Sequence, residues 1–198
     1  MVAYRSLRVV TPPAVEPVTL TMAKLHCRVD TTDDDAYITN LIVAAREWCE
    51  SFTGMTFVHA ELAIRFDSLP EFFTLPRPPM AADNTATPVS ITLTALDGVT
   101  SVVSTATYRV DRFSKPGVVR LANAKAWPSH SADFNAVEAR WWAGYSADAS
   151  AVPQRVKNAM LMLVAWWYER RMAADQAGLV EVPMGVKDLL GTVKWSFY

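Results

Sequence analysis

The sequence predicts an α+β protein in which a small helical bundle, made by the N- and C-terminal segments, is interrupted by an antiparallel β insert. Helical periodicity covers residues 20–53, alternating and turn-rich sequence covers residues 57–142, and helical periodicity returns at Pro153. We therefore expect a helical connector domain of residues 1–54 and 145–198, and an inserted antiparallel β subdomain of residues 55–144.

Two helices are expected before the β insert. Thr19 is a suitable N-cap for a short helix over residues 20–27. Asp33 is expected to cap a longer helix, whose apolar residues recur every three or four positions as far as Thr53. Gly54 follows directly, where a helix C-terminus favours glycine.

Alternation and turn signals predict the strands of the insert. Residues 57–66 alternate as a half-buried strand does, and residues 89–104 form a hairpin pattern around Asp97-Gly98, a pair suited to a type I′ turn. Further strands are expected at 72–75, 108–111, 118–121 and 136–142.

The C-terminal part returns to helix. Pro153 is a favourable first-turn residue for a long helix over residues 155–174, and a last short helix is expected at 186–190.

Composition excludes several classes of protein. The chain has 198 residues, of which 51% are hydrophobic and 20% charged, and its formal net charge is −1. It is too apolar to be disordered, and near-neutral charge argues against gripping nucleic acid over the whole surface. Two cysteines cannot form a disulfide framework, and no apolar run is long enough to cross a membrane. These features favour a soluble protein made in a reducing cytoplasm.

Motifs of catalysis and cofactor binding are missing. The three histidines have no metal-ligand spacing, and every glycine stands outside a phosphate-binding pattern. The acidic run over residues 30–35 lacks the glycine and the final glutamate of a calcium loop, so helix capping explains it better. We expect no cofactor, no metal and no enzymatic activity; an enzyme with an unrecognised site is the remaining alternative.

Large apolar side chains are more informative. Adjacent tryptophans on a strand point to opposite faces of the sheet, and the last long helix is apolar around most of its circumference. Either one large core buries these residues, or a second subunit covers some of them, or they form a stacking surface for sugars. The candidate subunit-interface residues are Trp141, Trp142, Met160, Leu163, Trp166 and Trp167.

The order of short motifs resembles the head–tail connector (adaptor) family of long-tailed double-stranded DNA phages over nearly the whole chain. The motifs are EPVTL at 16–20, AK at 23–24, RVD at 28–30, DDAYI at 34–38, AARE at 44–47, FTG at 52–54, LPRPP at 75–79, YRVD at 108–111, WP at 127–128, AGY at 143–145, VP at 152–153, LVAWWYERR at 163–171 and VPMGV at 182–186.

This resemblance implies a structural virion protein located in the particle neck. It would form a homo-oligomeric ring, dodecameric in the virion, below the portal protein. The ring would extend the channel through which double-stranded DNA passes and would receive stopper or tail-completion proteins. A cyclic ring uses two different patches on each subunit, which agrees with apolar surface on two separate elements.

Two further surfaces are expected in such a ring. Residues 30–54 carry a net charge of −5, so the acidic helix start at Asp33, Asp34 and Asp35 is expected to face the channel or solvent. The C-terminal aromatics Trp195 and Phe197, with Tyr198, either dock on the portal or fold back on their own core.

An alternative function of another class remains open. Exposed aromatic side chains of the β insert would suit a carbohydrate- or receptor-binding module, because sugar rings stack on them.

Overall fold

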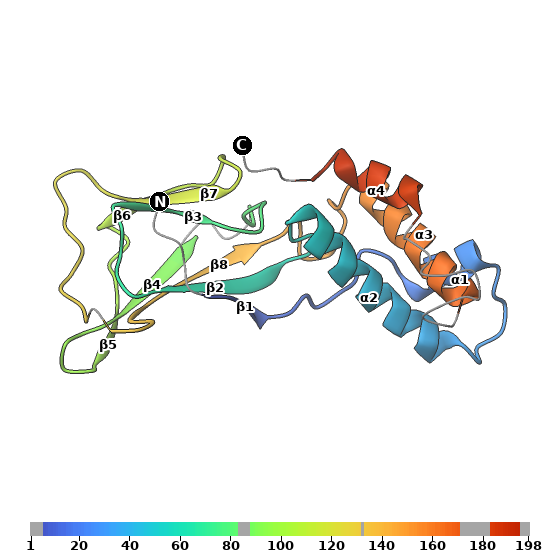
Figure 1. Cartoon of the computed structure of the whole chain (residues 1–198), viewed down its shortest axis with the longest axis horizontal. Coiled ribbons are helices and arrows are strands. Elements are labelled where there is room, and N and C mark those ends of the chain that lie inside the picture. Colours follow the sequence, from blue (N-terminus) through green and yellow to red (C-terminus); the bar gives the residue numbers. More distant parts are fainter. Residues whose placement is uncertain (1–5, 83–87, 132, 171–182, 195–198) are drawn as a thin grey trace.

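The computed structural model describes residues 6–82, 88–131, 133–170 and 183–194. The molecule is elongated, with the helices gathered at one end and the strands at the other (Figure 1). Four helices and two antiparallel sheets are present in the described residues, so the predicted α+β class is confirmed.

The helices pack against one another at one end of the molecule. Their bounds are α1 Leu20–Cys27, α2 Asp35–Thr53, α3 Gln154–Glu169 and α4 Met184–Gly191. Thr19 caps α1 as predicted, because its hydroxyl accepts a hydrogen bond of 3.2 Å from the Met22 N–H. Gly54 ends α2 as predicted: its φ of 69° is left-handed, and its N–H donates to the Glu50 carbonyl.

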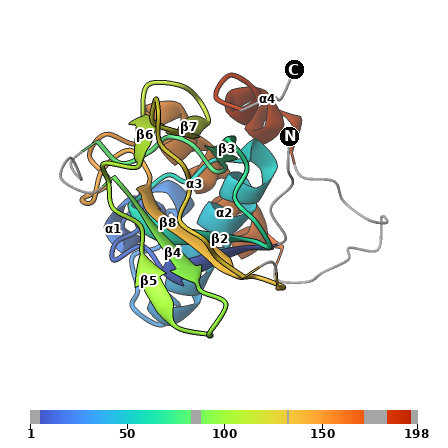
Figure 2. The ribbon, with the colours of Figure 1, turned by 90° about the vertical axis from the view of Figure 1, so that its left-hand side faces the viewer.

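The β end contains two sheets that face each other (Figure 2). A five-stranded sheet has the order β1-β2-β8-β4-β5, and a three-stranded sheet has the order β3-β7-β6. All paired strands are antiparallel. The strand bounds are β1 Ser6–Thr11, β2 Ala60–Phe66, β3 Phe72–Leu75, β4 Val89–Thr94, β5 Thr100–Val102, β6 Tyr108–Asp111, β7 Gly117–Leu121 and β8 Val137–Ala143.

Each end has its own hydrophobic cluster. Side chains of all four helices form one cluster, which also includes Phe57 and Val58 from the chain that enters the sheet. The second lies between the two sheets and includes Ile64, Trp141 and Val119. The Tyr108 hydroxyl joins the sheets by donating a 2.6 Å hydrogen bond to the Val89 carbonyl.

The structure differs from the sequence predictions at three places. Residues 6–11, expected within the helical part, form the edge strand β1 on β2, because their backbone pairs with the free side of that strand. The hairpin after β4 has three loop residues: the Ala95 N–H donates to the Val99 carbonyl, and Gly98 is left-handed while Asp97 is not, which excludes a type I′ turn. Helix α3 ends at Glu169, whereas the prediction extended it to residue 174.

Candidate interaction surfaces

The outer face of the five-stranded sheet carries an arginine cluster around one carboxylate. Glu138 on β8 accepts hydrogen bonds from Arg65 at 2.7 Å, from Arg8 at 3.0 Å and from Arg140. These residues come from three neighbouring strands, β1, β2 and β8. Arg65 of β2 is paired with Glu138 of β8. Ala63 of β2 is paired with Arg8 of β1 on one side and with Arg140 of β8 on the other. The cluster is therefore fixed by strand register.

Electrostatics hold the cluster in its charged form. Burial acts to raise the pKa of Glu138, but the hydrogen bonds and charges of Arg140 and Arg65 outweigh it and leave that pKa below its usual value. Three arginines on one glutamate leave excess positive charge on an accessible face. Trp142 lies on this face too, because it alternates with the buried Trp141 along β8. Arginine and tryptophan are the side chains most enriched at energetically important interface positions.

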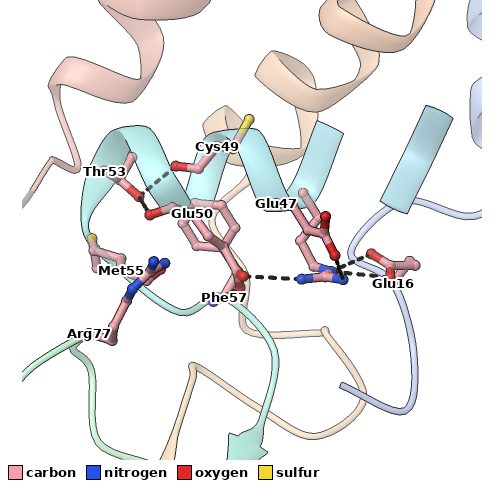
Figure 3. Close-up of polar contacts among 9 residues, drawn as sticks. Glu16, Glu47, Cys49, Glu50, Thr53, Met55, Phe57 and Arg77 are labelled. Carbon is pink, nitrogen blue, oxygen red and sulfur yellow. Dashed lines mark hydrogen bonds and ion pairs between the residues drawn. The ribbon is translucent and has the colours of Figure 1, made fainter. Parts of the chain in front are cut away.

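A second polar cluster joins the helices to the sheet. Arg46 of α2 donates to the Glu16 carboxylate at 2.9 Å and to Glu50 at 3.1 Å, and Glu50 accepts a 2.8 Å hydrogen bond from the Phe57 N–H. Figure 3 shows Glu16, Glu47 and Glu50 around this position on α2. Burial raises the pKa of Glu50 even though the Phe57 N–H and Arg46 act to lower it.

This junction borders a cleft of about 370 Å³. Its lining comes from α2, from residues 7–13 and from the start of β2. The charged groups beside it, Arg46 and Glu50, are already paired with each other, and Arg77 donates to the Met55 carbonyl at 3.5 Å. The cluster therefore fixes how the helices sit on the sheet. Sequence reasoning missed it, although the i,i+4 spacing of Arg46 and Glu50 was a usable signal.

Three of the residues predicted for a subunit interface lie inside the single chain. Trp141 is 2% exposed, and Met160 and Leu163 are fully buried. Alternation on β8 places Trp141 between the two sheets, and the helical period places Met160 and Leu163 in the cluster that the four helices form. These three predictions are wrong, because the chain's own second sheet and helices supply the covering surface.

The other three interface candidates are half-buried: Trp142 on β8, and Trp166 and Trp167 on α3. The Arg170 guanidinium lies over the Trp166 ring, 5.3 Å from its centroid. Trp167 packs against the helical cluster with part of its surface. The half-buried tryptophans thus occur at both ends of the molecule.

Two of the three carboxylates at the acidic helix start interact with side chains from other parts of the chain. Asp34, and not Asp33, is the N-cap residue, and its carboxylate accepts a 2.6 Å hydrogen bond from the Tyr168 hydroxyl. Asp35 forms a 2.6 Å ion pair with Lys24. The predicted capping role of Asp33 is therefore wrong: the helix begins one residue later, and Asp33 is exposed. The predicted docking residues Trp195, Phe197 and Tyr198 lie outside the described residues.

Neither a metal site nor a membrane span is found in the described part of the chain. No group of three His, Cys, Asp or Glu side chains there could hold a metal ion. None of the helices in that part is both long and apolar enough to cross a bilayer.

Comparison with known proteins connects this fold to particle necks. Residues 17–107 match the family model described as phage gp6-like head-tail connector protein. The resemblance to head–tail connectors is thereby confirmed for that part of the chain. No curated protein matches the sequence significantly.

Solved structures match over the whole chain. A chain in the neck of an empty gene transfer agent (GTA) particle, computed with C6 symmetry, is 22% identical with a TM-score of 0.78, covering 98% of this chain and 97% of that chain. A chain in the neck of the native particle, computed with C12 symmetry, is 21% identical with a TM-score of 0.73, covering 98% and 97%. At this identity the likeness establishes the shared fold. The matching family model describes head-tail connector proteins, and the matching structures are of particle necks.

Proposed function

We propose that this chain is a structural virion protein of the neck of a phage-like particle, where copies form a ring below the portal, extend the DNA channel and join head to tail. The observation that carries this proposal is the fold match to a neck protein along 98% of the chain. The connector family match over residues 17–107 supports it independently. The C12 symmetry used for one neck structure is compatible with a ring of twelve copies.

The ring needs two different contact patches on each subunit. We assign one to the outer face of the five-stranded sheet, around Trp142 and the arginines on Glu138, and the other to the exposed sides of Trp166 and Trp167. These residues combine partial exposure with the aromatic and arginine character typical of interface centres. The helical part and the β part would then each contact a neighbouring copy.

The remaining partners follow from the position of the ring. The portal protein would bind above it, with Trp195, Phe197 and Tyr198 as the docking residues, and stopper or tail-completion proteins would bind below. Double-stranded DNA would pass through without sequence-specific contacts. Asp33, the exposed member of the acidic helix start, would face solvent or the channel.

The alternative of a sugar-binding module receives less support from the β insert. Trp141 is buried between the sheets, and the Trp127 indole donates a 2.9 Å hydrogen bond to the Pro70 carbonyl and packs near Tyr108. Trp141 therefore has no free face for a sugar ring, and Trp127 is half-buried.

Reconstitution with the portal protein of the same particle tests the proposal. We expect the purified chain to bind the portal ring as a closed ring of about twelve copies, which native mass spectrometry and electron microscopy would detect. A chain that lacks residues 195–198 should remain folded but bind the portal more weakly. Absence of portal binding by the full chain, or normal tail joining in particles without this protein, would refute the proposal.

A further inference from the structure

The three-stranded sheet carries a local positive charge, although the net charge of the whole chain is close to zero. Residues 105–127, which contain β6 and β7, hold five Lys or Arg residues and one Asp, a net of +4 in a chain whose total is −1. Sequence reasoning missed this segment because residues 55–144 taken together have equal numbers of acidic and basic residues. The positive charge is therefore local to this sheet, because acidic residues elsewhere in residues 55–144 balance it.

Strand register brings two of these cations together on the outer face. Arg109 of β6 lies directly opposite Arg120 of β7, and Arg120 lies opposite the half-exposed Phe72 of β3. Tyr108 and Val119, which alternate with the arginines, point into the core instead. The outer face thus presents a row of one aromatic ring and two guanidinium groups across all three strands.

Beside this row the surface is hollowed. A hollow of about 240 Å³ is lined by Arg109, Arg120 and Lys125, together with Asn123 and the apolar residues Ala106, Leu121 and Ala122. A phosphate group is small enough for this space, and every polar side chain around it can donate a hydrogen bond.

The acidic residues nearby do not neutralise the row. Glu71 is 3.8 Å from Arg120, with both side chains well exposed, so this contact is weak. Asp111 accepts hydrogen bonds from the Phe113 and Ser114 N–H groups within its own turn. Like charges directly opposite one another destabilise an antiparallel pair, and a bound anion would relieve that repulsion.

We propose that this face, formed by Arg109, Arg120 and Lys125, contacts the phosphodiester backbone of duplex DNA. The inference rests on the proposed function, which brings DNA close to the ring. A row of cations suits a repeating polyanion, and contacts to phosphates alone carry no base readout and let DNA slide. The helix α2 lies at the other end of the molecule from β6 and β7 (Figure 1).

Binding of a fluorescent 20-base-pair duplex to the full chain tests the inference. We expect fluorescence anisotropy to detect binding at about 20 mM salt that weakens steeply toward 150 mM, because cation–phosphate contacts release counterions. The double variant Arg109→Gln with Arg120→Gln should bind at least about tenfold more weakly at low salt, and the log–log salt slope should fall by about 2.

A matched variant controls for total charge. Arg28→Gln with Lys157→Gln removes two cations from the helical end and should change DNA affinity less than about twofold. Circular dichroism melting of both double variants checks that they are folded. Wild-type chain that does not bind the duplex at low salt, or an Arg109 and Arg120 variant that binds it equally well, would overturn the inference.

Two competing anions test whether the basic face binds a ligand other than DNA. Poly-L-glutamate that binds the wild-type chain more tightly than the duplex does would indicate an acidic protein surface and overturn the DNA assignment. Millimolar inorganic phosphate that saturates the site while the duplex fails to bind would indicate a free-phosphate site and also overturn it. Failure of the proposed function can be distinguished from failure of this inference, because ring assembly on the portal is measured without DNA.

Discussion

At the scale of single residues, neighbours on other strands and helices decide what each charge does. Glu138 stays ionised because arginines from β1, from β2 and from its own strand β8 surround it. Glu50 experiences the opposite balance, since burial raises its pKa despite a nearby arginine. The spacing of Glu138 and Arg140 along the sequence predicts that they share a face, but only the strand register brings Arg8 and Arg65 to them.

Arg46 gives the sharpest test at this scale. Arg46→Ala should lower the free energy of unfolding by about 3 kcal/mol or more, because it leaves the carboxylates of Glu16 and Glu50 without their cation. Glu47→Ala is the matched control: Glu47 is 67% exposed, lies 3.7 Å from Arg46 and should cost no more than about 0.5 kcal/mol. Urea unfolding measures both, and equal effects of the two changes would contradict a structural role for the junction cluster.

At the scale of elements, the strength of a sequence signal depends on how much of the element is buried. The long helix α2 and the strand β2 follow their predicted patterns closely because one face of each is buried. The edge strand β1 escapes prediction because most of its residues are exposed and show no clear alternation. The three-residue turn before β5 depends on hairpin register, which the Asp97-Gly98 pair does not determine.

Gly144 tests the link between β8 and the helical end. Its φ is 123°, and an added Cβ would lie 2.5 Å from the backbone carbon of Val58. Gly144→Ala should therefore destabilise the fold by at least about 2 kcal/mol, read from a lower thermal unfolding midpoint.

Gly191 provides the control for this change. It is the last residue of α4 and has open space around the position of an added Cβ, so Gly191→Ala should shift the stability by about 0.5 kcal/mol or less. Similar losses at Gly144 and Gly191 would show that the close approach to Val58 does not constrain the chain.

At the scale of the whole molecule, two hydrophobic clusters bury some of the large aromatic side chains and leave others partly exposed. The face-to-face sheets bury Trp141, while Trp142, Trp166 and Trp167 keep accessible surface at opposite ends. For Trp141, Met160 and Leu163, the alternative of a core within the single chain applies, and these three interface candidates are wrong. For the half-buried tryptophans an intersubunit contact stays a prediction.

Substitution of each of the two adjacent tryptophans of β8 is expected to affect a different property, stability for Trp141 and assembly for Trp142. Trp141→Ala should lower the free energy of unfolding by about 3–5 kcal/mol, because it empties a buried site between the sheets. Trp142→Ala should cost much less stability and should instead reduce ring formation on the portal. Thermal melting and native mass spectrometry measure the two effects. A Trp142→Ala chain that assembles like the wild type would exclude the outer sheet face as an interface.

The sequence by itself determined the α+β class, the helices around residues 20–53, most strands, and the resemblance to head–tail connectors, because these depend on local periodicity, caps and motif order. Only the tertiary structure decided which tryptophan is covered, that Asp34 and Asp35 are engaged by other parts of the chain, and that Arg109 faces Arg120. The physical reason is that burial and charge pairing depend on strand register and helix packing, which join residues far apart in the sequence.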